Sequence, residues 1–228
     1  MRGGSHATRE ARAVTARDFA QTMREANILI KKVEQIGIKE MRTYAEKMSQ
    51  QGLSQRTIAN RLSHLRSALQ SAGKAQMLER KEASNKALGA SGGSRIGTHK
   101  PMSNADYERI RQNLSARNPQ AAAIMELQRA LGLRQQEALK GSTRDNLKNW
   151  EKQLKEGYAK VEKGTKGGRV RETVVKSYER AVNAVQNALR SIEKGSKAVL
   201  EAKDYKTALN QLKNDYRAAG MTGELSSH

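Results

Sequence analysis

The sequence predicts a mainly α-helical protein, with a four-helix bundle, a flexible linker, and then an α-rich mixed α+β domain that holds one small β-hairpin. Composition is the first reason: the chain has only two prolines and is rich in Ala, Lys, Arg, Glu and Gln, which favour helices. Apolar residues also recur in steps of three and four in both halves. Finally, a Gly/Ser-rich stretch separates the halves, and 228 residues suffice for two small domains with their own cores.

The first predicted domain spans residues 10–84 and contains four short helices. The first helix covers about 17–34 and ends before Gly37, and the second runs from about 38 to Gly52. Ser54 is a suitable N-cap for the third, and the fourth covers about 74–83. The apolar residues expected to face the core are Phe19, Met23, Ala26, Ile30, Val33, Met41, Ala45, Met48, Ile58, Leu62, Leu65, Leu69, Met77 and Leu78.

The outer side of the third helix is basic, because Arg56, Arg61 and Arg66 lie off its apolar stripe. Each of these arginines is either an ordinary solvated side chain or a contact to a polyanion. The following residues, 85–100, combine glycine and serine with scattered cations and predict a flexible linker.

The second predicted domain spans residues 101–228. Its first helix starts at Ser103, which caps it, and ends near Asn118. The next helix is apolar and breaks at Gly132, directly before Arg134. A guanidinium at such a junction can grip two phosphate oxygens, although a plain helix junction has the same pattern. Glu137 follows three residues later and forms either a surface ion pair or a support for Arg134.

A β-hairpin is predicted around the glycine-rich segment Gly164–Gly168. Alternation on both sides indicates strands at about 158–163 and 169–175, with Lys166 at the tip. The segment is not a nucleotide-binding loop, because the pattern G-x-x-x-x-G-K-[ST] is absent and the segment joins strand to strand. The rest of the chain predicts helices whose core stripes are Tyr178, Val182, Val185, Leu189 and Ile192, then Tyr205, Leu209, Leu212 and Tyr216.

The net charge of +20 and a pI of about 10.3 favour a polyanionic partner. No apolar run reaches the roughly 20 residues that a membrane span needs. Only 4% of residues are aromatic, which disfavours binding of single strands by base stacking, whereas binding of a duplex through its phosphates needs no aromatic residues. The chain has no cysteine, and its four histidines are scattered, so we expect neither a metal site nor another cofactor.

The order of the motifs resembles that of the tyrosine recombinases (phage integrase family). Arg134 in Leu-Gly-Leu-Arg-x-x-Glu, Lys166 in the hairpin, and His228 match the arginine, lysine and histidine of that family. The resemblance implies that these three residues are catalytic, with Glu137 in support and Lys163 as the alternative lysine. It also implies that residues 10–84 form a DNA-binding core-binding domain, with Arg56, Arg61, Arg66, Arg169 and Arg171 as candidate DNA contacts.

The resemblance stops at His228. In the family, a second arginine and then the nucleophilic tyrosine follow the histidine, whereas every tyrosine here precedes it. We therefore expect a recombinase truncated within its catalytic domain, which binds duplex DNA without cutting it. The resemblance further implies that the intact protein is a homo-oligomer on DNA, and that it is cytoplasmic and associated with the nucleoid. Two alternatives remain: a non-catalytic basic DNA-binding protein of chromatin or regulatory type, and an RNA-associated protein.

Overall fold

The computed structural model describes residues 5–94, 100–223 and 225–226. The chain divides into two compact units, residues 1–97 and 98–228. Both are built mainly of helices, and the second also contains a two-stranded antiparallel hairpin, which confirms the predicted fold class. No helix within the described residues is both long and apolar enough to cross a membrane.

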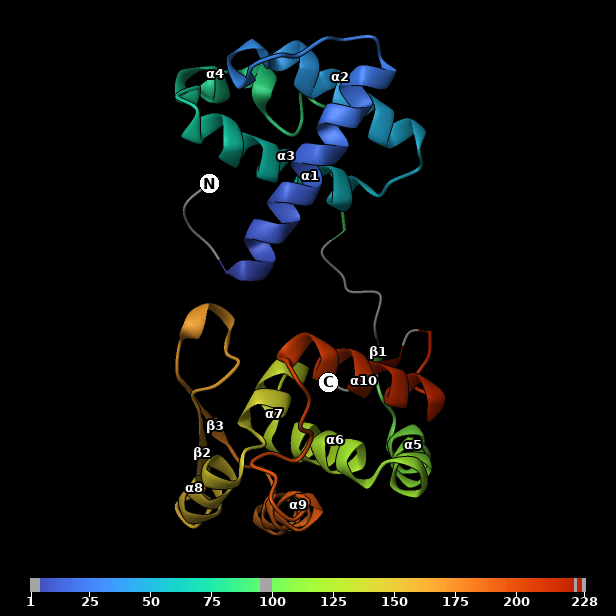
Figure 1. Ribbon diagram of the computed structural model, residues 1–228, viewed down its shortest axis with the longest axis vertical. Helices are drawn as coiled ribbons and strands as arrows, with labels where there is room; N and C mark the ends of the chain where they lie inside the picture. Colours follow the sequence, from blue (N-terminus) through green and yellow to red (C-terminus); the bar gives the residue numbers. More distant parts are fainter. Residues whose placement is uncertain (1–4, 95–99, 224, 227–228) are drawn as a thin grey trace. The chain divides into compact units, whose positions relative to one another are not determined.

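The first unit contains four α-helices and two short 3-10 turns among its described residues (Figure 1). They are α1 (His6–Glu25), η1 (Val33–Gln35), α2 (Ile38–Gln50), α3 (Gln55–Ser71), α4 (Ala75–Glu79) and η2 (Lys81–Ala83). The predicted stripes of α2 and α3 are buried; for example, Met41, Met48, Leu62 and Leu69 have no exposed surface. The Ser54 side chain accepts a hydrogen bond from the Thr57 backbone and caps α3 as predicted.

The prediction of one helix over residues 17–34 is wrong at both ends. α1 begins eleven residues earlier, at His6, and stops at Glu25. Asn27 then adopts a left-handed conformation with φ of 57°. The amides of Asn27 and Ile28 donate to the carbonyls of Arg24 and Met23, both at 2.9 Å, which is a Schellman ending. Residues 28–32 continue without helix, so the helical spacing of the apolar residues there is coincidental.

The start of the Gly/Ser-rich segment packs on the first unit. Leu88 and Ala90 are 4% and 2% exposed and join its core. Arg66 secures this segment, because its guanidinium donates to the Ala83 carbonyl at 2.7 Å and to Asn85 Oδ1 at 2.7 Å. Burial lowers the pKa of Arg66. The chain is thus held against the preceding helices at points as far along as Ala90.

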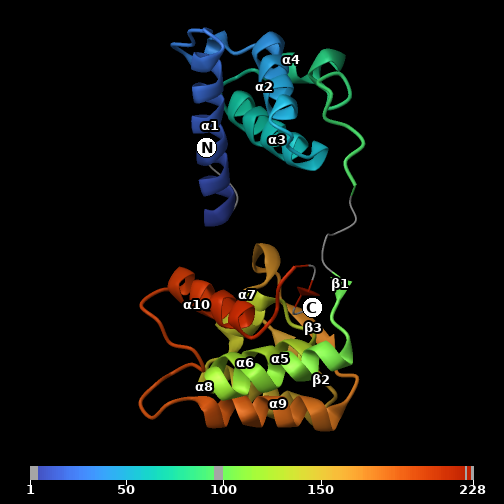
Figure 2. The same cartoon turned by 90° about the vertical axis from the view of Figure 1, so that its right-hand side faces the viewer.

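The second unit is organised around α6. Its helices are α5 (Asn104–Arg117), α6 (Pro119–Leu131), α7 (Gln135–Gly141), α8 (Arg144–Leu154), α9 (Tyr178–Ser191) and α10 (Tyr205–Ala218). Figures 1 and 2 both show α6 between α9 on one side and α10 on the other. This place agrees with its sequence, since eight of its thirteen residues are buried. A helix that is apolar on most sides needs neighbours on most sides.

The predicted hairpin is formed by β2 (Tyr158–Val161) and β3 (Arg171–Val174), with Tyr158 opposite Val174 and Val161 opposite Arg171. Trp150 of α8 fixes β2, because its indole N–H donates to the Lys160 carbonyl at 2.8 Å. The loop between the strands contains a 3-10 turn, η3 (Lys166–Gly168). A second, parallel pair joins β1 (Lys100–Pro101) to β4 (Leu225–Ser226) and was not predicted.

Candidate functional site

The turn between α6 and α7 presents Arg134. Gly132 ends α6 in the left-handed region, with φ of 59°, where a side chain would be strained. Leu133 is fully buried and anchors the turn. Arg134 follows as the N-cap of α7, and its side chain is 57% exposed. A buried leucine beside an exposed arginine leaves the guanidinium at the surface on a fixed backbone.

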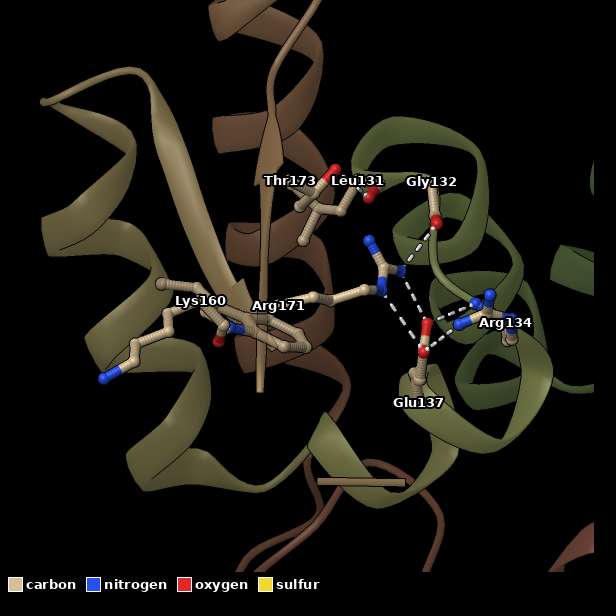
Figure 3. Close-up of polar contacts among 8 residues, drawn as sticks. Leu131, Gly132, Arg134, Glu137, Lys160, Arg171 and Thr173 are labelled. Atoms are coloured by element: carbon tan, nitrogen blue, oxygen red, sulfur yellow. Dashed lines mark hydrogen bonds and ion pairs between the residues drawn. The ribbon is translucent and has the colours of Figure 1, made fainter. Parts of the chain in front are cut away.

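The Glu137 carboxylate holds Arg134 and lies between the guanidinium groups of Arg134 and Arg171 (Figure 3). Its side chain is 0% exposed. Oε1 accepts a hydrogen bond from Arg134 Nη1 at 2.8 Å, and Oε2 accepts one from the Arg134 backbone N–H at 2.9 Å. The same carboxylate therefore caps the start of α7 and orients the guanidinium. The predicted pairing of Arg134 with Glu137 is present.

A third side chain, Arg171 of β3, completes the cluster from the opposite side of Glu137 (Figure 3). Its Nη2 lies 2.6 Å from Oε2 and 3.0 Å from the Gly132 carbonyl oxygen, and its Nε lies 3.3 Å from Oε1. The sequence placed Arg171 among DNA contacts and missed this role. The alternation of the strand places Arg171 and Thr173 on one face, and in the structure the Thr173 hydroxyl also donates to the Leu131 carbonyl at 3.0 Å.

The charge of Glu137 is stabilised by these partners. Burial alone would raise its pKa, but the hydrogen bonds from Arg171 and from the backbone and side chain of Arg134 outweigh burial and lower the pKa to about 2. Glu137 is thus an anion at any physiological pH. One negative charge is shared by two guanidinium groups, so the cluster is cationic and suits a phosphate.

The hairpin loop lies against α7 at Gly164. A Cβ on this residue would stand 2.5 Å from the Gln136 carbonyl oxygen, and its φ is 78°, so only glycine fits. Lys166 is exposed in the turn η3, and Lys163 and Arg169 are exposed in the same loop. The contacts within the described chain do not separate Lys166 from Lys163, and Lys166 stays the prediction from the motif.

The remaining predicted site residues occupy different settings. Arg56 is exposed at the start of α3. Arg61 forms an ion pair with Asp18, which also accepts from the Tyr44 hydroxyl, and Arg66 holds the segment after α4. His228 lies outside the described residues. No group of three or more potential metal ligands occurs within the described chain.

Comparison with known proteins identifies the class. A family model for integrases matches residues 89–228, and one for the N-terminal domain of phage integrases matches residues 1–78. The chain belongs to the phage integrase family, the tyrosine recombinases. Its Arg134, Glu137 and hairpin lysines lie within the first of these matches. No curated protein sequence matches the chain significantly.

Two solved structures share the fold. The integrase of the Tn1549 transposon, in complex with transposon right end DNA, is 15% identical, with a TM-score of 0.64 over 97% of this chain and 76% of that one. A lambda integrase tetramer bound to a Holliday junction is 16% identical, with a TM-score of 0.59 over 99% of this chain and 61% of that one. At such identities the likeness concerns the fold alone.

Proposed function

We propose that this chain binds duplex DNA and supplies part of the active site of a site-specific recombinase, with Arg134 contacting the phosphodiester to be cleaved. The observation that carries this proposal is the exposed Arg134 guanidinium held by a fully buried carboxylate. A solvated surface arginine needs no such support. A group that must meet charge in a transition state benefits from being fixed in advance.

The chemistry follows from the residue types. In the family reaction, a tyrosine attacks the phosphorus and forms a phosphotyrosine link, which divides one displacement into two. Negative charge grows on the non-bridging oxygens, and a preorganised donor such as Arg134 stabilises it by about 3–4 kcal/mol. Lys166 would protonate the departing 5′ oxygen, and His228 would assist the movement of protons.

The 228-residue sequence contains no tyrosine after Tyr216 and no arginine after Arg217. Tyr216 is 3% exposed, and its hydroxyl donates to Gln128 Oε1 at 2.6 Å, so it serves the core. We infer that these 228 residues alone bind DNA without forming a covalent link to it. Assembly on DNA as a homo-oligomer and association with the nucleoid belong to the same proposal, since the lambda integrase is a tetramer on its junction.

The test is a salt titration of binding to a short duplex by the purified 228-residue chain, followed by fluorescence anisotropy. We expect a steep decline of log K with log salt, at roughly −0.9 for each neutralised phosphate. Arg134→Ala should make the slope shallower by about one contact. Arg117→Ala, which removes an exposed arginine at the end of α5, is the matched control and should leave the slope unchanged.

Two outcomes would oppose the proposal. If Arg134→Ala and Arg117→Ala change the salt slope equally, Arg134 is no specific phosphate contact, and a non-catalytic basic DNA-binding protein is the better interpretation. A covalent protein–DNA adduct on a nicked duplex would contradict the inference that these residues bind without cutting.

A further inference from the structure

The cluster around Glu137 uses its two arginines in different ways. Glu137 offers about four lone-pair positions on its two oxygens, and the structure fills all of them. Oε1 accepts from Arg134 Nη1 and Arg171 Nε, and Oε2 accepts from the Arg134 amide and Arg171 Nη2. The carboxylate is therefore fully occupied, and both guanidiniums are held in place by it.

Arg171 directs its donors inward. Its Nε and Nη2 bond to Glu137, and Nη2 also bonds to the Gly132 carbonyl, so two of its three nitrogens serve the protein. Arg134 commits only Nη1 of its side chain, which leaves Nε and Nη2 without a partner among the described residues. The exposed fractions agree, with 31% for the Arg171 side chain and 57% for that of Arg134.

Arg171 also joins two parts of the site. It lies at the first position of β3, opposite Val161, where the loop that carries Lys166 returns to the hairpin. Through Glu137 and the Gly132 carbonyl, it binds this end of the loop to the turn that presents Arg134. Gly164 contacts the backbone of Gln136 near the other end of the loop. Both ends of the loop are thus attached to α7 or to the turn before it.

We infer that Arg171 is a positioning residue, which fixes Arg134 through Glu137 and attaches the hairpin loop to it, and that Arg171 is not itself a contact to DNA. This inference rests on the proposed function, because positioning matters only if Arg134 meets a phosphate. It replaces the expectation that Arg171, like Arg169, binds the DNA backbone.

The test compares Arg171→Ala with Arg169→Ala, which removes the same charge from an exposed site two residues away. In the purified 228-residue chain, NMR of ¹³C-labelled carboxyl groups follows the titration of Glu137, assigned with Glu137→Gln. Arg171→Ala should raise the pKa of Glu137 clearly above about 2, whereas Arg169→Ala should not. Duplex binding should lose about 0.9 of salt slope in Arg169→Ala whether or not Arg134 is present, whereas Arg171→Ala should lose slope only while Arg134 is present.

A double-mutant cycle then measures the coupling. Arg134→Ala should weaken duplex binding about tenfold or more in the unchanged chain, as expected for a charged hydrogen bond, and by clearly less in the Arg171→Ala background. If Arg171→Ala unfolds the chain, Arg171→Lys replaces it. A lysine keeps the charge but cannot span both carboxylate oxygens and the carbonyl. The rise in the Glu137 pKa and the coupling to Arg134 should therefore be present but smaller.

Different results would contradict the positioning role of Arg171 and the proposed function. A Glu137 pKa that stays at about 2 in Arg171→Ala, or a loss of salt slope in Arg171→Ala that is just as large when Arg134 is already replaced, overturns the positioning role. An unchanged chain that fails to bind duplex DNA overturns the proposed function, and the Glu137 titration still reports on the contact between Arg171 and Glu137.

Discussion

Replacement of Glu137 by glutamine should change how stability depends on pH. The carboxyl group has a pKa of about 2 in the folded chain, against a usual value of 4.5. A group whose folded pKa is depressed stabilises the fold above its unfolded pKa and ceases to do so as pH falls through its folded pKa. At about 1.4 kcal/mol for each pKa unit, Glu137 contributes about 3 kcal/mol at pH 7. This contribution should disappear between about pH 5 and pH 2.

Urea unfolding of the unchanged chain and of Glu137→Gln provides the assay. Trp150 is the only tryptophan and is 1% exposed within the second unit, so its fluorescence reports that unit alone. The free energies of unfolding should differ most at neutral pH and converge by about 3 kcal/mol toward pH 2. Other titrating carboxyl groups are present in both proteins and cancel in the difference. A difference that stays constant with pH would refute the assignment of a strong charge pair to Glu137.

Three further predictions concern single contacts. Gly164→Ala should destabilise the second unit by more than about 1 kcal/mol, and clearly more than Gly167→Ala, which also has a positive φ but open space around it; urea unfolding measures both, and equal effects would contradict the close approach. Arg66→Ala should speed hydrogen exchange at the Leu88 amide, since it removes the bonds that hold that segment; unchanged protection would show that the segment is held otherwise. Asp18→Asn should lower the stability of the first unit by about 1–3 kcal/mol, because it weakens the charged contacts among three helices. Thermal unfolding followed by circular dichroism measures this loss, and an unchanged melting temperature would contradict the prediction.

The sequence predicts elements where local periodicity and tertiary packing agree. In α3, four apolar residues recur at helical spacing and all of them face the core: Ile58, Leu62, Leu65 and Leu69. In α1, the same reasoning fails after Glu25, because the left-handed residue Asn27 turns the chain while apolar residues continue at similar intervals. β1 and β4 give no signal at all, since each has two residues and its partner lies more than a hundred positions away.

The site shows the same division. Arg134 and Glu137 are neighbours along the chain, so their contact follows from helical spacing. Arg171 lies 34 residues from Glu137, and its contact depends on how β3 approaches the turn before α7. In a chain of this charge, a basic hairpin suggests that each of its arginines contacts DNA. Only the folded arrangement separates Arg169, which is exposed, from Arg171, which turns inward.

A crystal structure of the chain bound to duplex DNA would test the role of Arg134 directly. We expect the Arg134 guanidinium to lie about 2.7–2.9 Å from non-bridging oxygens of one phosphodiester, with the Lys166 ammonium next to the same phosphate and Arg171 still bound to Glu137. A complex in which Arg134 faces solvent, or in which Arg134 and Lys166 contact distant parts of the duplex, would contradict this expectation.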